Sequence, residues 1–214
     1  NWSKINFRFP DPIQCGQIIF RAENLCKSYT DNVVFREVDL TMIKGERIAF
    51  VGNNGCGKTT LVKLLNREID FDGFLKVGEK VEINYYAQSQ EEKLDSSLTI
   101  LETLEKAAPD RKQSELRGIL GAFLFPGDTI LKKAAILSGG EKSRLAICAM
   151  LQIPGNLLIM DEPTNHLDMI SKEILKNALL EYKGSLIIVS HDRSFLTGLT
   201  ERVLEFKRGK IREF

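Results

Sequence analysis

Short apolar runs alternate with longer stretches of helical spacing along the chain. Residues 18–25 and 33–42 are rich in apolar and β-branched side chains, which predicts two early antiparallel strands. Residues 46–52, 156–163 and 185–191 are apolar enough to be buried strands, and the second of these is apolar on both faces, as central parallel strands are. The chain therefore begins with strands and continues with buried strands of a parallel sheet.

Helical spacing follows several of the predicted strands. Leu61, Leu64 and Leu65 share one face of residues 58–69, which predicts a helix there. Similar spacing predicts helices at 97–108, 113–125, 139–153, 171–182 and 193–201, whereas 73–77 and 82–88 return to strand and 202–214 form a closing hairpin around Gly209. The fold class predicted is α/β, with a mixed or parallel sheet, an antiparallel β edge and an α-helical subdomain at about 95–152.

Composition narrows the class of protein only slightly. The 214 residues carry 30 Lys and Arg against 29 Asp and Glu, so the net charge of +1 does not require a polyanion as partner. The four cysteines form no CxxC pair and there are only two histidines, which disfavours a structural zinc site and suggests a reducing compartment. Because no apolar run is long enough to span a membrane, we expect a cytoplasmic protein without a transmembrane segment.

The segment GNNGCGKTT follows a predicted buried strand and precedes a predicted helix. Its glycines and the Lys-Thr pair fit the phosphate-binding P-loop pattern, in which backbone N–H groups converge on phosphate oxygens at a helix N-terminus. Lys58 would reach the outer phosphates and Thr59 would offer its hydroxyl to Mg²⁺. The residues expected to bind the nucleotide are Gly52, Asn53, Asn54, Gly55, Cys56, Gly57, Lys58, Thr59 and Thr60. The motif alone indicates only that the chain binds a nucleoside triphosphate.

Two carboxylates end the predicted strand at 156–163. Ligands of open parallel sheets bind at strand ends, so Asp161 is expected to hold Mg²⁺ and Glu162 to take a proton from an attacking water. The same pair could instead cap the following helix.

The segment LSGGE opens another predicted helix. Ser138 and Glu141 have the spacing of a capping box, yet Gly139 and Gly140 fill the first turn, where glycine costs about 1 kcal/mol relative to alanine. Glycines in the first turn leave the backbone N–H groups of the helix start uncovered by side chains, which suggests a second anion site. Two such sites in one chain imply that a γ-phosphate is shared between two domains of this kind.

These motifs together resemble the Walker A, signature, Walker B and switch elements of ATP-binding cassette (ABC) domains. LSGGEKSRLA and DEPTNHLD are similar to family F, whose members carry two cassettes on one polypeptide and no membrane domain. INFRFP at residues 5–10 looks like the tail of the linker between those cassettes. The resemblance implies that residues 1–16 end an interdomain linker and that 17–214 are the second, C-terminal cassette.

The resemblance assigns further residues to roles. Tyr29 would stack on adenine, although it could be an ordinary edge-strand aromatic or share the stacking with Phe35. Gln88 would contact Mg²⁺ and the water as a catalytic residue, or could be an ordinary polar residue at the surface. His191 would touch the γ-phosphate, or could merely cap a strand end. The signature residues that would complete the partner's site are Leu137, Ser138, Gly139, Gly140 and Glu141, and Asp168 would lie at the dimer seam.

The implied activity is ATP hydrolysis with Mg²⁺ in a pair of cassettes, the second coming from the same full-length chain or from a homodimer. Family F further implies a translation-associated ATPase that acts on the ribosome and its RNA. A motor subunit of an ABC transporter is the alternative. Cys56, within the phosphate loop, is expected to be alkylated readily and shielded by ATP, or simply to fill the loop as a small residue.

Overall fold

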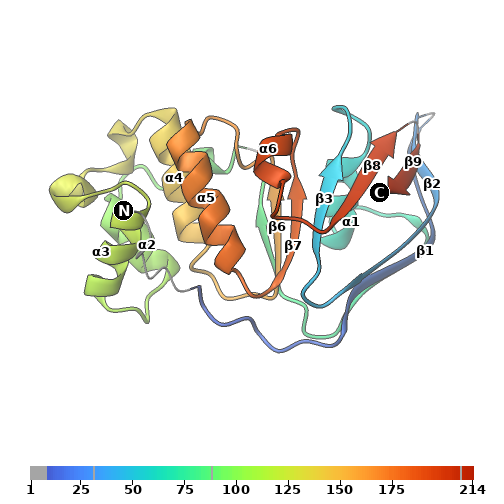
Figure 1. Ribbon diagram of the computed structural model, residues 1–214, viewed down its shortest axis with the longest axis horizontal. Helices are drawn as coiled ribbons and strands as arrows, with labels where there is room; N and C mark the ends of the chain where they lie inside the picture. Colours follow the sequence, from blue (N-terminus) through green and yellow to red (C-terminus); the bar gives the residue numbers. More distant parts are fainter. Residues whose placement is uncertain (1–8, 31, 88, 208) are drawn as a thin grey trace. The chain divides into compact units, whose positions relative to one another are not determined.

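The computed structural model describes residues 9–214 except 31, 88 and 208, and the chain divides into two compact units (Figure 1). The helical unit comprises the described residues up to Asp11 together with Tyr86–Pro154 and Pro163–Tyr182. The sheet unit comprises Pro12–Tyr85, Gly155–Glu162 and Lys183–Phe214.

The first sheet of the sheet unit is antiparallel and has the strand order β2-β1-β4. Strand β1 (Ile18–Tyr29) pairs with β2 (Asn32–Ile43) on one side and with β4 (Asp72–Val77) on the other, confirming the predicted antiparallel edge. Register shifts near Asn24 and Glu37, both with positive φ, bend these long strands.

The second sheet has the order β5-β6-β7-β3-β8-β9. Strand β3 (Arg47–Val51) is parallel to β7 (Ser185–Val189) and β8 (Arg202–Lys207), and β6 (Leu157–Asp161) is parallel to β7. β5 (Ile83–Tyr86) lies at one edge, and β9 (Lys210–Glu213) closes the other edge as an antiparallel hairpin with β8. All residues of β6 and β7 are buried, as their apolar sequences predict.

Apolar side chains from both sheets and from helix α1 (Lys58–Leu65) form the core of the sheet unit. Phe50 and Phe206 meet with ring centroids 5.1 Å apart, and Leu61, Leu64 and Leu65 of α1 are buried on the face predicted from their spacing. The segment after β3 is therefore anchored on both sides, by a central strand and by a buried helix.

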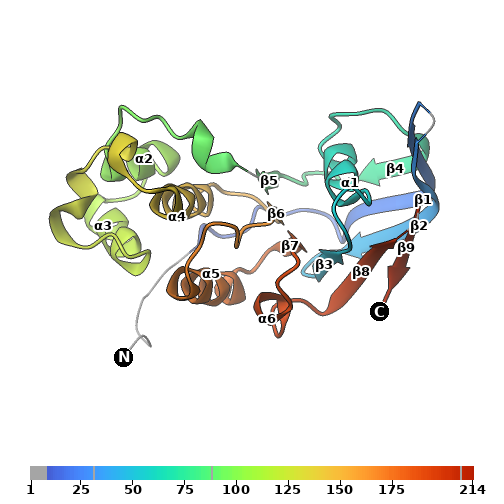
Figure 2. The ribbon, with the colours of Figure 1, turned by 90° about the horizontal axis from the view of Figure 1, so that it is seen from above.

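The helical unit contains α2 (Ile100–Ala107), α3 (Gln113–Ala122), α4 (Gly139–Met150) and α5 (Met169–Glu181). Three short 3₁₀ helices, η1 (Gln90–Lys93), η2 (Gly127–Leu131) and η3 (Ala134–Ile136), connect them. Helices α4 and α5 run side by side in both views (Figures 1 and 2). The described helices include none that is both long and apolar enough to cross a membrane.

Five predicted helices are shorter than expected. Those predicted at 97–108, 113–125 and 139–153 are α2, α3 and α4 with the bounds given above, and the other two lose four or five residues from their C-terminal ends. The helix predicted at 58–69 ends at Leu65 because Arg67 adopts a left-handed conformation with φ 59°. The helix predicted at 193–201 is only α6 (Arg193–Leu196), in the sheet unit, since Thr197 and Gly198 leave the helical conformation. The proposed linker, residues 1–16, begins outside the described residues; its described part, 9–16, forms neither helix nor strand, and its assignment remains a prediction.

Candidate functional site

The first and last glycines of the phosphate loop, Gly52 and Gly57, occupy positions where a side chain would collide with neighbouring atoms. Gly52 follows β3 with φ 139°, and a Cβ there would collide with the carbonyl oxygen of Phe206. Gly57, with φ 106°, is the N-cap of α1, and a Cβ there would lie 2.6 Å from Val34 Cγ1. The loop therefore adopts its curl only with glycine at both ends, and α1 begins at its rim with free N–H groups.

Lys58 is the first residue of α1 and is 6% exposed. Its ammonium donates to the carbonyl oxygens of Gly52 (2.5 Å) and Asn53 (3.0 Å), and Cys56 Sγ lies 3.8 Å away. The cation is thus held inside the loop that the sequence predicts to cradle phosphate.

Thr59 and Asp161 meet where α1 begins and β6 ends. Thr59 Oγ1 donates to Asp161 Oδ2 at 3.0 Å. Burial raises the pKa of Asp161, and hydrogen bonds from Thr59 and Tyr85 together with the charge of Lys58 oppose that rise. A hydroxyl beside a carboxylate is the oxygen donor set that Mg²⁺ prefers, so these two residues fit the predicted metal site.

Tyr85 was not predicted as a site residue. Its hydroxyl lies 3.4 Å from Asp161 Oδ2. Burial, followed by the nearby charge of Asp161, raises the pKa of Tyr85, so the phenol, which is protonated at neutral pH in any case, keeps its proton to higher pH. The sequence holds one signal for it. Tyr85 and Tyr86 are adjacent on one strand, and successive side chains of a strand point to opposite faces, so one of the two tyrosines lies on each face of the sheet.

Glu162 directly follows β6 and lies beside His191. The His191 Nε2 atom is 3.2 Å from Glu162 Oε1 and 3.1 Å from Asn54 Oδ1. Burial raises the pKa of Glu162, and the neighbouring His191 opposes the rise. Glu162 also has a left-handed backbone with φ 49°, a conformation that costs a non-glycine residue about 1–3 kcal/mol.

Tyr29 lies at the end of β1 and is 46% exposed, with the Lys27 ammonium 4.8 Å from its ring centroid. Phe35, considered as a second stacking residue, is only 1% exposed and faces Gly57 in the core. Tyr29 is therefore the aromatic of this pair that can offer a ring to a ligand.

The signature residues lie in the helical unit, at the start of α4. Ser138 and Glu141 form the predicted capping box: Ser138 Oγ accepts from Glu141 N at 3.3 Å, and Glu141 Oε2 accepts from Ser138 N at 2.8 Å. These bonds lower the pKa of Glu141. Gly139 faces open space, whereas a Cβ on Gly140 would lie 2.9 Å from the His166 carbonyl oxygen; Leu137 is buried.

Asp168 caps α5 in the same unit. Its Oδ1 accepts from Ser171 N at 2.7 Å, which lowers the pKa of Asp168. Arg144 of α4 donates to Ser171 Oγ at 3.0 Å, so the signature helix and the helix that follows Asp168 are joined by a hydrogen bond.

The structure brings most sheet-unit candidates together. Asn54 and Glu162 both contact His191, and Thr59 contacts Asp161. Burial raises the pKa of Asp161 and of Glu162, and the charge of Lys58 opposes the rise at both carboxylates. Gln88 lies outside the described residues, so its catalytic and metal-binding roles remain predictions.

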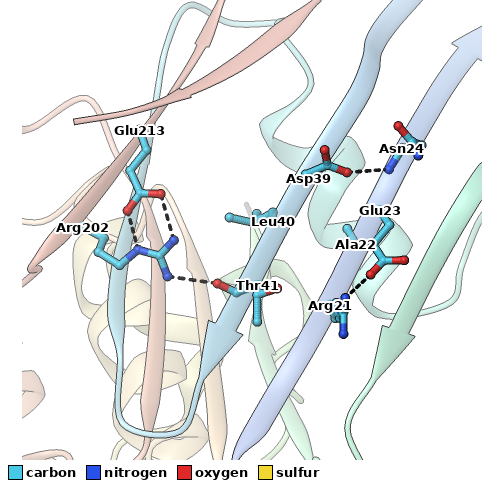
Figure 3. A pocket seen from close by; sticks show the side chains of 9 residues that line it. All are labelled: Arg21, Ala22, Glu23, Asn24, Asp39, Leu40, Thr41, Arg202 and Glu213. Carbon is cyan, nitrogen blue, oxygen red and sulfur yellow. Dashed lines mark hydrogen bonds and ion pairs between the residues drawn. The ribbon is translucent and has the colours of Figure 1, made fainter.

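A separate groove of about 580 Å³ lies on the antiparallel sheet (Figure 3). Arg202, in its lining, donates to both carboxylate oxygens of Glu213 at 2.6 and 2.9 Å and to the Thr41 carbonyl oxygen at 3.0 Å. Arg21 pairs with Glu23 in the same lining. Its lining contains none of the predicted site residues, and these charged groups already bind one another.

Comparisons with known proteins identify the family of the chain. Residues 35–165 match the family model described as "ABC transporter". The chain is 41% identical over 213 residues to "ABC transporter F family member 5" of Arabidopsis thaliana, covering 99% of this chain and 31% of that protein. It is 44% identical over 211 residues to "Putative ATP-binding protein YdiF" of Bacillus subtilis, covering 98% of this chain and 33% of that protein. The chain thus spans about a third of the length of these relatives.

A solved structure shares the fold. "Structure of a bacterial Atm1-family ABC exporter with ATP bound" matches with a TM-score of 0.77 at 19% identity, covering 94% of this chain and 39% of that one. In this chain, the family model covers more than half of the residues and includes the phosphate loop and the paired carboxylates. The chain belongs to the ABC transporter family and is an ATPase domain of that family.

Proposed function

We propose that the sheet unit binds ATP with Mg²⁺ and that hydrolysis occurs when a second cassette faces it. Oxygen Oε1 of Glu162 carries this proposal. It is buried, lies 3.2 Å from His191 and receives no hydrogen bond from the described part of the chain. A buried acceptor that has a histidine nitrogen nearby but no hydrogen bond from the described residues is suited to a water molecule. A carboxylate with a raised pKa is suited to take that water's proton.

The other residues of the sheet unit would bind and orient the substrate. Lys58 would exchange its bonds to Gly52 and Asn53 for bonds to the outer phosphates, and Tyr29 would stack on adenine. Thr59 and Asp161 would hold Mg²⁺, which when bound neutralises charge on the phosphate oxygens. His191 would contact the γ-phosphate from its place beside Glu162.

The second half of the site would come from another cassette. Ser138, Gly139 and Gly140 present a helix start with little side chain, which suits a phosphate of the facing subunit, and Asp168 would lie at the seam. The partner would be a second cassette of the same full-length chain or a second copy of this one. A single cassette is then expected to bind ATP but to hydrolyse it slowly.

We further propose that ATP-driven pairing serves translation, with the ribosome as partner in the cytoplasm. The support is the similarity of LSGGEKSRLA and DEPTNHLD to family F and the identity to a protein named as an F family member. The alternative is a motor that drives a separate membrane protein.

The test changes Glu162, and its counterpart in the other cassette of the full-length protein, to Gln. Turnover is expected to fall at least about 100-fold, since the general base is lost, while ATP binding persists and holds the cassettes together. Glu181→Gln, on the exposed end of α5, is the matched control and should retain normal turnover. Parental turnover in the Glu162 variant would contradict the general-base role.

The same variant separates the two cellular roles. Sedimentation with ribosomes in ATP but not in ADP would support the translation role. If the variant closes on ATP and still fails to sediment with ribosomes, the transporter motor becomes the better proposal.

A further inference from the structure

Tyr85 and Thr59 both point a hydroxyl at the same oxygen of Asp161. Thr59 approaches Asp161 Oδ2 from the start of α1 at 3.0 Å, and Tyr85 approaches it from β5 at 3.4 Å. The carboxylate is therefore oriented by two elements that lie far apart in the sequence, and all three residues belong to the sheet unit.

The packing of the Tyr85 ring helps to hold its hydroxyl beside Asp161. Its partly buried ring packs against the sheet-unit core, which restricts the movement of the hydroxyl. Asp161 itself is 3% exposed, and a buried carboxylate oxygen needs donors to replace water. The packing of Tyr85 and the burial of Asp161 therefore both favour this contact.

The two contacts differ in what happens when Mg²⁺ is present. In the proposed function, Thr59 turns a lone pair of its hydroxyl to the metal, whereas Tyr85 does not belong to the donor set. We infer that Tyr85 is a positioning residue, which holds the Asp161 carboxylate in the orientation that Mg²⁺ requires. Hydrogen-bond partners of metal-site carboxylates commonly contribute about 10–100-fold to metal affinity, and the 3.4 Å separation places this one near the lower end. This inference rests on the proposed function.

The experiment compares Tyr85→Phe with Tyr86→Phe in the full chain. Both changes delete only a hydroxyl. Successive residues of β5 point to opposite sides, so Tyr86→Phe removes a buried phenol hydroxyl from the same strand on the other side and is the control. Binding of a fluorescent ATP analogue is titrated with Mg²⁺, and the electron paramagnetic resonance spectrum of Mn²⁺ added with nucleotide reports the metal's surroundings directly.

Tyr85→Phe is expected to raise the Mg²⁺ midpoint about 10-fold and to broaden the Mn²⁺ spectrum, while nucleotide binding in EDTA and circular dichroism stay as in the parent. Tyr86→Phe should leave the midpoint unchanged. An unchanged midpoint and spectrum in Tyr85→Phe would overturn the inference.

Asp161→Asn distinguishes failure of this inference from failure of the proposed function. If Asp161→Asn shifts the midpoint and Tyr85→Phe does not, only the role of Tyr85 is wrong. If the parent shows no Mg²⁺ dependence, or Asp161→Asn leaves it intact, the proposed metal site itself is wrong.

Discussion

Arg67 and Glu162 share an uncommon backbone conformation for opposite reasons. Arg67 is exposed and follows the C-cap of α1, where its N–H bonds to the Leu64 carbonyl oxygen (3.0 Å) and the next N–H bonds to that of Lys63 (2.9 Å). This is a Schellman ending, in which glycine usually occupies the left-handed position. Glu162 has φ 49° at the candidate site itself, where the strained backbone aims its carboxylate toward His191. Strain at Arg67 is therefore removable, whereas strain at Glu162 would serve the general-base role proposed for that residue.

Arg67→Gly is expected to stabilise the protein by about 0.5–1 kcal/mol. The change removes a left-handed penalty of about 1–2 kcal/mol, and the greater freedom of glycine in the unfolded chain offsets part of the gain. The free energy of unfolding in urea measures it. Lys63→Gly, on the exposed face within α1, is the matched control and should destabilise by about 1 kcal/mol. A loss of stability in Arg67→Gly would show that its side chain contributes more than its backbone costs.

At the scale of elements, the existence of each helix and strand was more predictable than its ends. Leucine spacing predicted the buried face of α1, and the capping box predicted the start of α4, because both depend on neighbours in the sequence. The end of α1 was missed because arginine, and not glycine, occupies the left-handed position there. The Tyr85–Asp161 contact was missed as well, since it joins two strands whose pairing no local pattern reveals.

Asn156 connects elements in a way that the sequence also concealed. Its side chain is 2% exposed; Nδ2 donates to the carbonyl oxygens of Ile13 (3.1 Å) and Lys80 (2.7 Å), and Oδ1 accepts from Glu82 N (2.9 Å). One amide thus joins the start of β6 to the segment before β1 and to the approach to β5.

Asn156→Ala is expected to destabilise the sheet unit by about 3 kcal/mol, because the three hydrogen bonds of this buried side chain are lost. Thermal and urea unfolding test this value. Asn32→Ala, at an exposed strand start, should change stability by less than about 0.5 kcal/mol. Equal effects of the two substitutions would mean that water replaces the lost amide at no cost.

Across the sheet unit, Arg202 joins the last hairpin to the first sheet. Its guanidinium binds Glu213 of β9, Glu46 before β3 (2.8 Å) and the Thr41 carbonyl of β2. The hydrogen bond from Arg202 lowers the pKa of Glu213 below its ordinary value of 4.5. A lowered pKa in the folded state means that this pair stabilises the protein above about pH 4.5 and that the contribution is lost as pH falls through the folded value.

Arg202→Met is therefore expected to destabilise by about 1–2 kcal/mol at pH 7, with the difference from the parent shrinking below about pH 4.5. The value is modest because Glu213 is half exposed. Urea unfolding at pH 7, 5 and 3.5 measures it, with Lys210→Met as a control that should show no such trend. A difference that stays constant over this pH range would contradict the role of the ion pair.

The central position of β3 also determines when the phosphate loop can form. β3 contains residues 47–51, yet both strands that flank it come from residues 185–207. Contacts between such distant segments form late, because the intervening chain must first be brought together. While the chain is being synthesised, the loop that follows β3 emerges before the two strands that flank β3, so no neighbouring strand fixes it until residues 185–207 are made. A nascent chain that lacks residues 185–207 would present the nucleotide motif without the strands that shape it, and ATP could not stabilise it before those residues are made.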